Sequence, residues 1–176
     1  MSNYTEAPAR VDQQSIYERV LAEFQCEHPT VVLTRFTKSN NTSEFRRQCL
    51  VCGECIGCVK KSTLSMADLD GMPDWDRTIG ERRRTAWRER YEALRAEAEG
   101  ERDREWQEWF GRYLRSPRWA LKRQLVLERE DHLCQGCRSA RAVEVHHTTY
   151  ANAGNEPLFD LVALCSACHR SVHGRE

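Results

Sequence analysis

The sequence has no long hydrophobic run, and its beginning carries no apolar leader. A membrane-spanning helix needs about 18 or more consecutive apolar residues, whereas Leu161–Cys165, among the longest apolar runs, has five. The first residues, MSNYTEAPARVDQQ, are polar and lack the apolar core of a secretory signal. We therefore expect no membrane partner and a cytoplasmic location, in a bacterial or phage-infected host cell.

The chain also lacks net charge, since its 176 residues include 27 basic and 27 acidic side chains. The charges are nevertheless segregated: residues 35–61 carry a net charge of +4, whereas residues 62–76 contain four aspartates and no basic residue. The acidic stretch includes Gly71 and Pro73, which favour turns. It predicts a linker after an N-terminal module.

Cysteine is abundant, with nine residues. In a cytoplasmic protein disulfides are rare, and eight of the nine cysteines fall in CxxC steps, a spacing typical of tetrahedral metal sites. Bound metal can supply folding free energy that a small core cannot. The sequence therefore predicts a metalloprotein. The four CxxC pairs are Cys49/Cys52, Cys55/Cys58, Cys134/Cys137 and Cys165/Cys168.

The two C-terminal pairs predict one structural zinc site. Cys134 and Cys137 are separated by 27 residues from Cys165 and Cys168, and two such pairs typically form one four-cysteine site. Between them the pattern predicts a strand at 142–147, a polar loop at 151–157 and a second strand from Leu161. A helix at 166–174 follows.

Four histidines lie in this same segment. His169 and His173 are four residues apart on the predicted helix, a spacing that places two imidazoles on one face. His146 and His147 are adjacent on a strand, so their side chains diverge. This geometry favours separate roles for the two neighbours over shared ligation of one ion.

The segment LCQGC…VEVHHTTYANAGNEPLFDLVALCSACHRSVH resembles the HNH endonuclease family, whose core is the ββα-metal fold. The resemblance covers residues 133–173, with the histidine pair and the zinc knuckles in the family's order. It implies a metal-dependent hydrolase of DNA phosphodiester bonds, with a divalent ion (Mg²⁺, Mn²⁺, Ni²⁺ or Zn²⁺) at the catalytic site. His146 would be a ligand of that ion and His147 the general base. His169 and His173 would complete the ligand set.

One position departs from the family pattern. Where the family has an asparagine that buttresses the active-site loop, this chain has Asp160. An asparagine amide both donates and accepts hydrogen bonds, whereas an ionised aspartate only accepts. Either the loop needs only an acceptor there, or Asp160 makes a different contact, including one to metal. We place it with His147 among the candidate catalytic residues.

The N-terminal cysteines allow three interpretations. Cys26, His28, Cys49 and Cys52 form a second zinc set in a segment that resembles small zinc-ribbon modules, with a strand expected at 30–35. An all-cysteine site built from residues 49, 52, 55 and 58 is an alternative, as is an iron–sulfur cluster. We favour the first set, which gives two structural zinc ions in all.

The middle of the chain predicts helices. Trp87, Tyr91, Leu94 and Ala98 recur at steps of four, three and four, which lines up one face of a helix expected to pack on the rest of the protein. Gly100 is a candidate break. Ser116-Pro117 predicts an N-cap and first turn of a second helix. A cluster of basic residues there is a candidate for DNA contact, and a solvated helix face is an equal alternative. The cluster consists of Arg115, Arg118, Lys122 and Arg123.

Together these patterns predict an α+β protein of small zinc-stabilised domains. Its parts are an N-terminal zinc-ribbon-like module (1–61), a linker (62–76), a charged helical segment (77–130) and an HNH nuclease domain (131–176). The function expected is a metal-dependent endonuclease. The alternative is a non-catalytic, zinc-stabilised DNA-binding protein on a degenerate nuclease scaffold.

Overall fold

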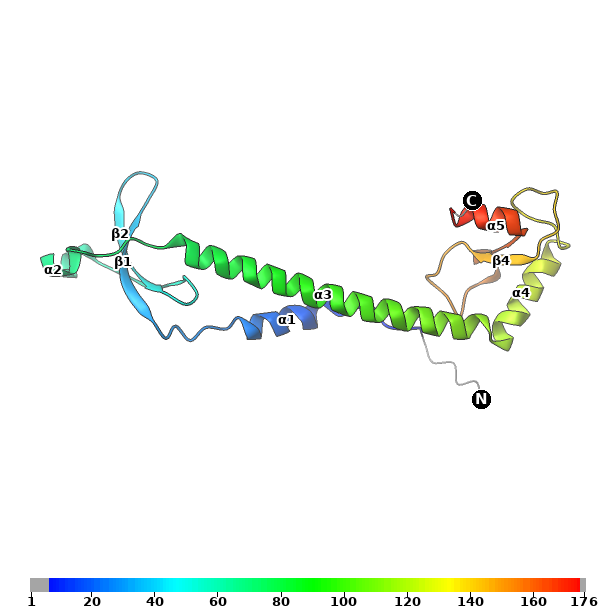
Figure 1. The fold of residues 1–176 in the computed structure, drawn as a ribbon, viewed down its shortest axis with the longest axis horizontal. Coiled ribbons are helices and arrows are strands. Elements are labelled where there is room, and N and C mark those ends of the chain that lie inside the picture. The colour runs from blue at the N-terminus through cyan, green and yellow to red at the C-terminus, as the bar shows by residue number, and fades with distance from the viewer. Residues whose placement is uncertain (1–6, 175–176) are drawn as a thin grey trace. The chain divides into compact units, whose positions relative to one another are not determined.

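The computed structural model describes residues 7–174, which form two compact units of a mixed α+β fold (Figure 1). One unit consists of residues 11–98. The other consists of residues 99–174 together with residues 7–10. The boundary falls inside the longest helix, α3 (Arg77–Leu114), and not at the expected linker. Among the described residues, no helix is long and apolar enough to cross a membrane.

In the first unit, helix α1 (Gln13–Glu23) packs on the first half of α3. The Asp12 side chain caps α1 by accepting a hydrogen bond from the Gln14 backbone N–H at 3.1 Å. Tyr17 meets the ring of Trp87 edge-on, with 5.6 Å between centroids. Val20 and Leu94 are buried. The aromatic face predicted for α3 is thus packed against its own unit, as expected.

The same unit contains a three-stranded antiparallel sheet in the order β1-β2-β3. Its strands are β1 (Val31–Thr37), β2 (Ser43–Cys49) and β3 (Cys55–Val59). The strand expected at 30–35 corresponds to β1. The pairing of β2 with β3 shifts register between Arg47 and Gln48, so that strand β3 has one extra residue there.

Residues 62–76, expected as a linker, are part of this unit. They contain the last residues of η1 (Lys61–Thr63) and the short helix α2 (Met66–Leu69). The following segment pairs with β1, because the Arg35 backbone N–H donates to the Pro73 carbonyl at 2.9 Å. The Gln48 side chain, fully buried, donates to the Asp76 carbonyl at 2.6 Å and accepts from its N–H at 3.0 Å. These contacts anchor the start of α3 to the sheet.

In the second unit, the end of α3 and helix α4 (Pro117–Arg129) cover a two-stranded sheet. The Ser116 hydroxyl caps α4 by accepting from the Trp119 N–H at 3.1 Å, with Pro117 in the first turn, as predicted. Helix α3 continues through Gly100 without a break. The buried core joins residues of α3, α4 and both strands: Trp109, Tyr113, Trp119, Val126, Leu127, Ala142, Val145, Leu161 and Ala163.

The C-terminal elements follow the predicted order of strand, loop, strand and helix. Strands β4 (Glu144–His147) and β5 (Leu161–Leu164) pair antiparallel, with His147 opposite Leu161. The one-turn helix η2 (Leu158–Asp160) precedes β5, and α5 (Ser166–Val172) follows it. Residues of β4 alternate between half-buried and buried, so Glu144 and His146 lie on one face and Val145 and His147 on the other.

Candidate metal centres and their surroundings

Three groups of metal-binding side chains are present among residues 7–174. In each group the candidate ligand atoms lie within 4.8 Å of one another. Two groups contain cysteine and could each hold a zinc ion, and the third contains only histidine. They are Cys26/His28/Cys49/Cys52, Cys134/Cys137/Cys165/Cys168 and His146/His169/His173.

The sheet register assembles the N-terminal group. Val31 at the start of β1 lies opposite Cys49 at the end of β2, so the residues just before β1 reach the turn after β2. The Cys26 and Cys49 sulfurs are 3.9 Å apart, and the Cys52 sulfur lies 3.2 Å from His28 Nδ1. Cys55 and Cys58 lie outside this group, exposed on β3. Of the three interpretations, the structure therefore brings together the Cys26/His28/Cys49/Cys52 set.

Gly53 makes the turn of this group possible. Its φ is +78°, and its N–H donates to the Cys49 carbonyl at 2.8 Å. A Cβ at this position would lie 2.5 Å from the Gly80 backbone nitrogen. Glycine is required there for both its backbone conformation and the close approach of α3.

The thiols of this group differ in acidity. Burial raises the pKa of Cys49, but hydrogen bonds from the Cys52 N–H and the His28 ring outweigh it and bring the pKa to about 6. Burial raises the pKa of Cys52 to about 11. A cation is therefore needed to hold all the sulfurs as thiolates, which is what a bound zinc ion does.

The C-terminal cysteines form two knuckles. The Arg138 N–H donates to the Cys134 carbonyl at 2.9 Å, which closes the first turn. Gly136 packs closely there, since a Cβ would lie 3.0 Å from the Cys168 sulfur, tighter than most Cβ contacts. Hydrogen bonds from the Ser139 hydroxyl and N–H lower the pKa of Cys137 to about 6. The turn thus prepares a thiolate for zinc.

The histidine group joins β4 to α5. The ring centroid of His146 lies 5.5 Å from that of His169 and 4.8 Å from that of His173, and the latter two are 4.7 Å apart. Burial, followed by the neighbouring histidines, lowers the pKa of His146. A neutral imidazole is the form that binds metal. Three nitrogen donors suit Zn²⁺, Ni²⁺ or Mn²⁺ and leave other coordination positions open.

Glu144 orients one of these candidate ligands. Its Oε2 lies 2.7 Å from His169 Nδ1. A carboxylate in this place fixes the imidazole tautomer with the proton on Nδ1, which leaves the Nε2 lone pair for an ion. Glu144 was not singled out from the sequence, although it shares a strand face with His146.

His147 points to the other side of β4, into the core. Its ring stacks on Trp119 at 4.7 Å with an interplanar angle of 14°, and on Tyr150 at 5.3 Å with 22°. Phe110 meets it edge-on at 5.5 Å. The side chain is 4% exposed, and this burial lowers its pKa. His147 is therefore a fixed, neutral imidazole near neutral pH.

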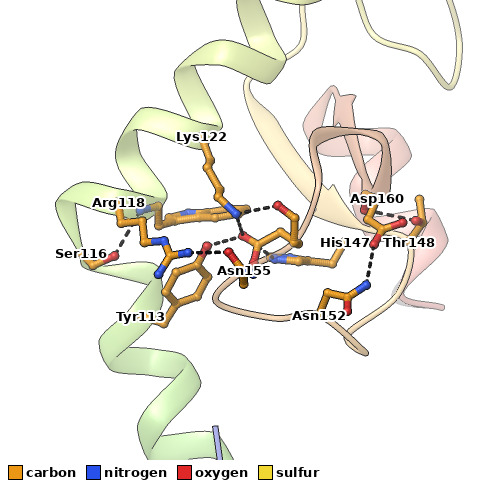
Figure 2. Close-up of polar contacts among 11 residues, drawn as sticks. Tyr113, Ser116, Arg118, Lys122, His147, Thr148, Asn152, Asn155 and Asp160 are labelled. Carbon is orange, nitrogen blue, oxygen red and sulfur yellow. Dashed lines mark hydrogen bonds and ion pairs between the residues drawn. The ribbon is translucent and has the colours of Figure 1, made fainter. Parts of the chain in front are cut away.

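A buried carboxylate, Glu156, faces His147. Its Oε1 accepts a hydrogen bond from the Tyr113 hydroxyl and lies 3.7 Å from both the Lys122 amine and His147 Nε2. Figure 2 shows Tyr113 and Lys122, from α3 and α4, converging with His147. Burial, followed by the Glu156 contact, raises the pKa of Tyr113, whereas burial lowers that of Lys122.

Two buried atoms of this cluster have no hydrogen-bond partner. They are His147 Nε2 and Glu156 Oε2. Because unpaired buried polar atoms are costly, a proton on Nε2 directed at the carboxylate is the favoured arrangement. That tautomer leaves the lone pair of His147 on Nδ1.

Asp160 acts as an acceptor within the loop. Its backbone carbonyl accepts from the Thr148 N–H at 2.8 Å and from the Thr148 hydroxyl at 3.1 Å, and its carboxylate accepts from Asn152 at 3.4 Å (Figure 2). It is not part of the histidine group. The two bonds from Thr148 use the main chain of Asp160, and its carboxylate accepts only from Asn152 among the hydrogen bonds of the described residues.

A pocket of about 340 Å³ joins the two faces of β4. His146, His169 and His173 line it together with His147. Arg123 of α4 also lines it. The pocket thus combines a candidate ion site, a buried histidine outside that site (His147) and a cationic side chain (Arg123).

The four candidate DNA contacts differ in their surroundings. Arg115 is exposed, and Arg118 is exposed and donates to the Asn155 side chain at 2.8 Å. Arg123 is exposed and donates to the Val143 carbonyl at 2.5 Å. Lys122 is only 16% exposed and donates to the Glu156 carbonyl at 2.5 Å. Its amine is used inside the protein, which leaves the three arginines as surface cations.

No protein-family model matches the chain, and no curated protein or solved structure is significantly similar to it.

Proposed function

We propose that this protein is a metal-dependent endonuclease of the HNH type that hydrolyses phosphodiester bonds of DNA. The observation that carries the proposal is the pocket in which three converging histidines meet a fourth, His147, held by aromatic rings and a carboxylate. A protein that only binds nucleic acid has no need of a fixed, neutral histidine beside an ion site.

His146, His169 and His173 would hold the divalent ion, and the chemistry of three imidazoles fits this assignment. When bound, the ion would supply polarisation of the phosphate and stabilisation of the charge on the leaving oxygen. Glu144 keeps His169 in the tautomer that can bind. The structural zinc ions are separate from this site.

His147 is assigned as the general base. The Glu156 carboxylate faces the protonated Nε2 of the His147 ring. The unprotonated Nδ1 is then the atom that accepts a proton from the water that attacks phosphorus. Stacking on Trp119 and Tyr150 fixes the ring plane, so little reorientation is needed during the reaction. Asp160 is assigned a positioning role through the hydrogen bond that its carboxylate accepts from Asn152 in the loop.

Arg123 is the candidate for phosphate binding within the pocket, with Arg115 and Arg118 on the same stretch of chain. Phosphate contacts of this kind position DNA without reading its sequence. DNA is therefore the partner that we assign.

One observation favours the second candidate, a non-catalytic DNA-binding protein. His147 is 4% exposed and its Nε2 faces the interior, so the ring serves the core as well as the pocket. A histidine kept only for packing would look similar. The cleavage assay separates the two functions.

The test incubates the purified full chain with supercoiled plasmid in EDTA, Mg²⁺, Mn²⁺, Ni²⁺ or Zn²⁺. We expect nicked or linear product with at least one metal and none with EDTA. His147→Ala should lower the rate by about 10²–10⁴-fold, the usual contribution of a positioned acid–base group. Its matched control is His132→Asn. His132 lies outside the pocket and outside the three groups of candidate ligands. Its φ is +56°, a backbone conformation that asparagine tolerates.

Cleavage by His147→Ala at the wild-type rate would refute the assigned base. DNA binding by the wild type without cleavage in any metal would instead establish the second candidate. Equal losses in His132→Asn and His147→Ala would show that the rate reports folding and not chemistry.

A further inference from the structure

Cys55 and Cys58 are the two described cysteines that belong to no metal group. Both are exposed on β3, next to the N-terminal ligand turn. Cys137, the other exposed cysteine, is part of the second zinc set. The pair therefore has no function in the two zinc sites or in the proposed nuclease pocket.

The register of the sheet places the two cysteines on one face. Cys55 lies opposite Gln48 and Cys58 opposite Arg46 in β2. These partners are two residues apart, and such residues project from the same side of a strand. On a regular strand, residues separated by three positions project to opposite sides, so a CxxC pair would diverge.

The bulge in β3 removes this divergence. Gly57 lies opposite Arg47, so Ile56 is the extra residue between it and Cys55. Lost solvation, followed by the neighbouring Cys55 thiol, raises the pKa of Cys58, as expected for two thiols that lie side by side. The Cys55 thiol donates to the Gly57 carbonyl at 3.6 Å. A Cβ at Gly57 would meet nothing within 4 Å, so the space beside the bulge is open.

From this arrangement we infer that Cys55 and Cys58 form a surface dithiol that exchanges reversibly with small-molecule disulfides to give an intramolecular disulfide. One thiolate attacks a sulfur of the small disulfide, which forms a mixed disulfide and releases one small thiolate. The second cysteine, as its thiolate, then attacks the protein sulfur of the mixed disulfide and releases the other small thiolate. The protein loses two protons and two electrons, and the small disulfide gains both.

A third zinc ion is the competing occupant of the pair. Zinc sites of the structural type need four ligands. Among the described residues, no histidine, aspartate or glutamate is grouped with these two sulfurs at ligand distance. Two thiols alone fit a disulfide better than a closed zinc site.

The test uses the full, zinc-loaded chain and oxidised glutathione. After alkylation of the remaining thiols, we expect intact mass and peptide mapping to show a link between Cys55 and Cys58, no glutathione adduct and an unchanged zinc content. Below the thiol pKa the rate should rise about tenfold per pH unit, because the thiolate is the attacking species. Treatment with excess reduced glutathione should restore both thiols.

Two single variants sharpen the test. Cys55→Ser and Cys58→Ser should each stop at a stable mixed disulfide, because the resolving thiol is absent. The zinc-bound Cys137 serves as the internal control and should remain unmodified in all three proteins.

Adducts on wild-type Cys55 or Cys58 as stable as those of the variants would overturn the inference. So would protection of both thiols by a third equivalent of zinc, or a link that includes a zinc ligand. Failure of both thiols to react under conditions that oxidise the denatured chain would also overturn it. None of these outcomes depends on nuclease activity.

Discussion

Replacing Glu156 with glutamine tests the buried cluster behind His147. The glutamate is 2% exposed. Its Oε1 accepts a hydrogen bond from the Tyr113 hydroxyl and lies 3.7 Å from both the Lys122 amine and His147 Nε2. Glu156→Gln keeps the size of the side chain and removes only its charge. The change therefore isolates the electrostatic part of these contacts from packing.

The expected cost follows from the two strongest contacts. The Tyr113 bond changes from charge-assisted to neutral, a loss of about 1 kcal/mol. Loss of charge also leaves Lys122, 3.7 Å away and 16% exposed, without its counter-ion. Removal of one partner of a fully buried pair costs about 3–5 kcal/mol. Lys122 is partly solvated and keeps the Glu156 carbonyl, so we expect about 2–4 kcal/mol in total.

A double-mutant cycle with Lys122→Met assigns this cost. If the two groups act mainly on each other, the double variant should be less destabilised than the sum of the single variants, by about 1–3 kcal/mol. Unfolding in urea with zinc present, followed by tryptophan fluorescence, measures each free energy because Trp109 and Trp119 lie in this core. The matched control is Arg118→Met, whose contact with Asn155 is exposed and should contribute less than about 1 kcal/mol.

A cost for Glu156→Gln no greater than for the Arg118 control, with no coupling to Lys122→Met, would refute the reasoning. It would mean that the charge of Glu156 does not stabilise the folded protein. The tautomer assigned to His147 would then lose its physical basis.

Other expectations concern the histidine site. His146→Ala should weaken divalent metal binding, measured by calorimetry, and added metal should partly restore cleavage, whereas His147→Ala should keep metal affinity and lose about 10²–10⁴-fold in rate. Glu144→Gln should weaken metal binding by about 10–100-fold, as loss of an outer-shell partner usually does, and unchanged calorimetry would refute its role. Since burial lowers the pKa of both His146 and His147, the folded state binds fewer protons than the unfolded state. Stability in urea, with two equivalents of zinc present for the cysteine sets, should therefore be highest above about pH 6.5 and fall as the pH drops below it, and a flat profile would contradict this.

Local patterns made much of the fold predictable. Cysteine spacing identified the C-terminal four-cysteine set, because a tetrahedral ion imposes CxxC steps on the chain, whereas at the N-terminus it left three interpretations. Ser116-Pro117 marked a helix start because capping is local chemistry. Alternation of polar and apolar residues before His146 located β4, because the two-residue period of a strand is also local.

Long-range contacts were beyond these patterns. The acidic stretch at 62–76 is held by Arg35 and Gln48, which are distant in sequence. Gly100 does not break α3, because a glycine costs a helix only about 1 kcal/mol and packing on either side outweighs it. Glu156 lies in a polar loop, where its composition indicates exposure, yet Tyr113 and Lys122 bury it.

The site depends on the zinc knuckles through helix α5. Cys165 precedes the helix and Cys168 lies within it, so a zinc ion bound at this set would fix the first turn. His169 follows Cys168 directly, and His173 lies one turn further on. Short helices are marginally stable without such support. Helix α5 has only seven residues and buries none of them fully, so it needs this support. The position of two of the three clustered histidines therefore depends on the cysteine site, and zinc bound at that site would be a structural condition for the pocket as well as for the fold.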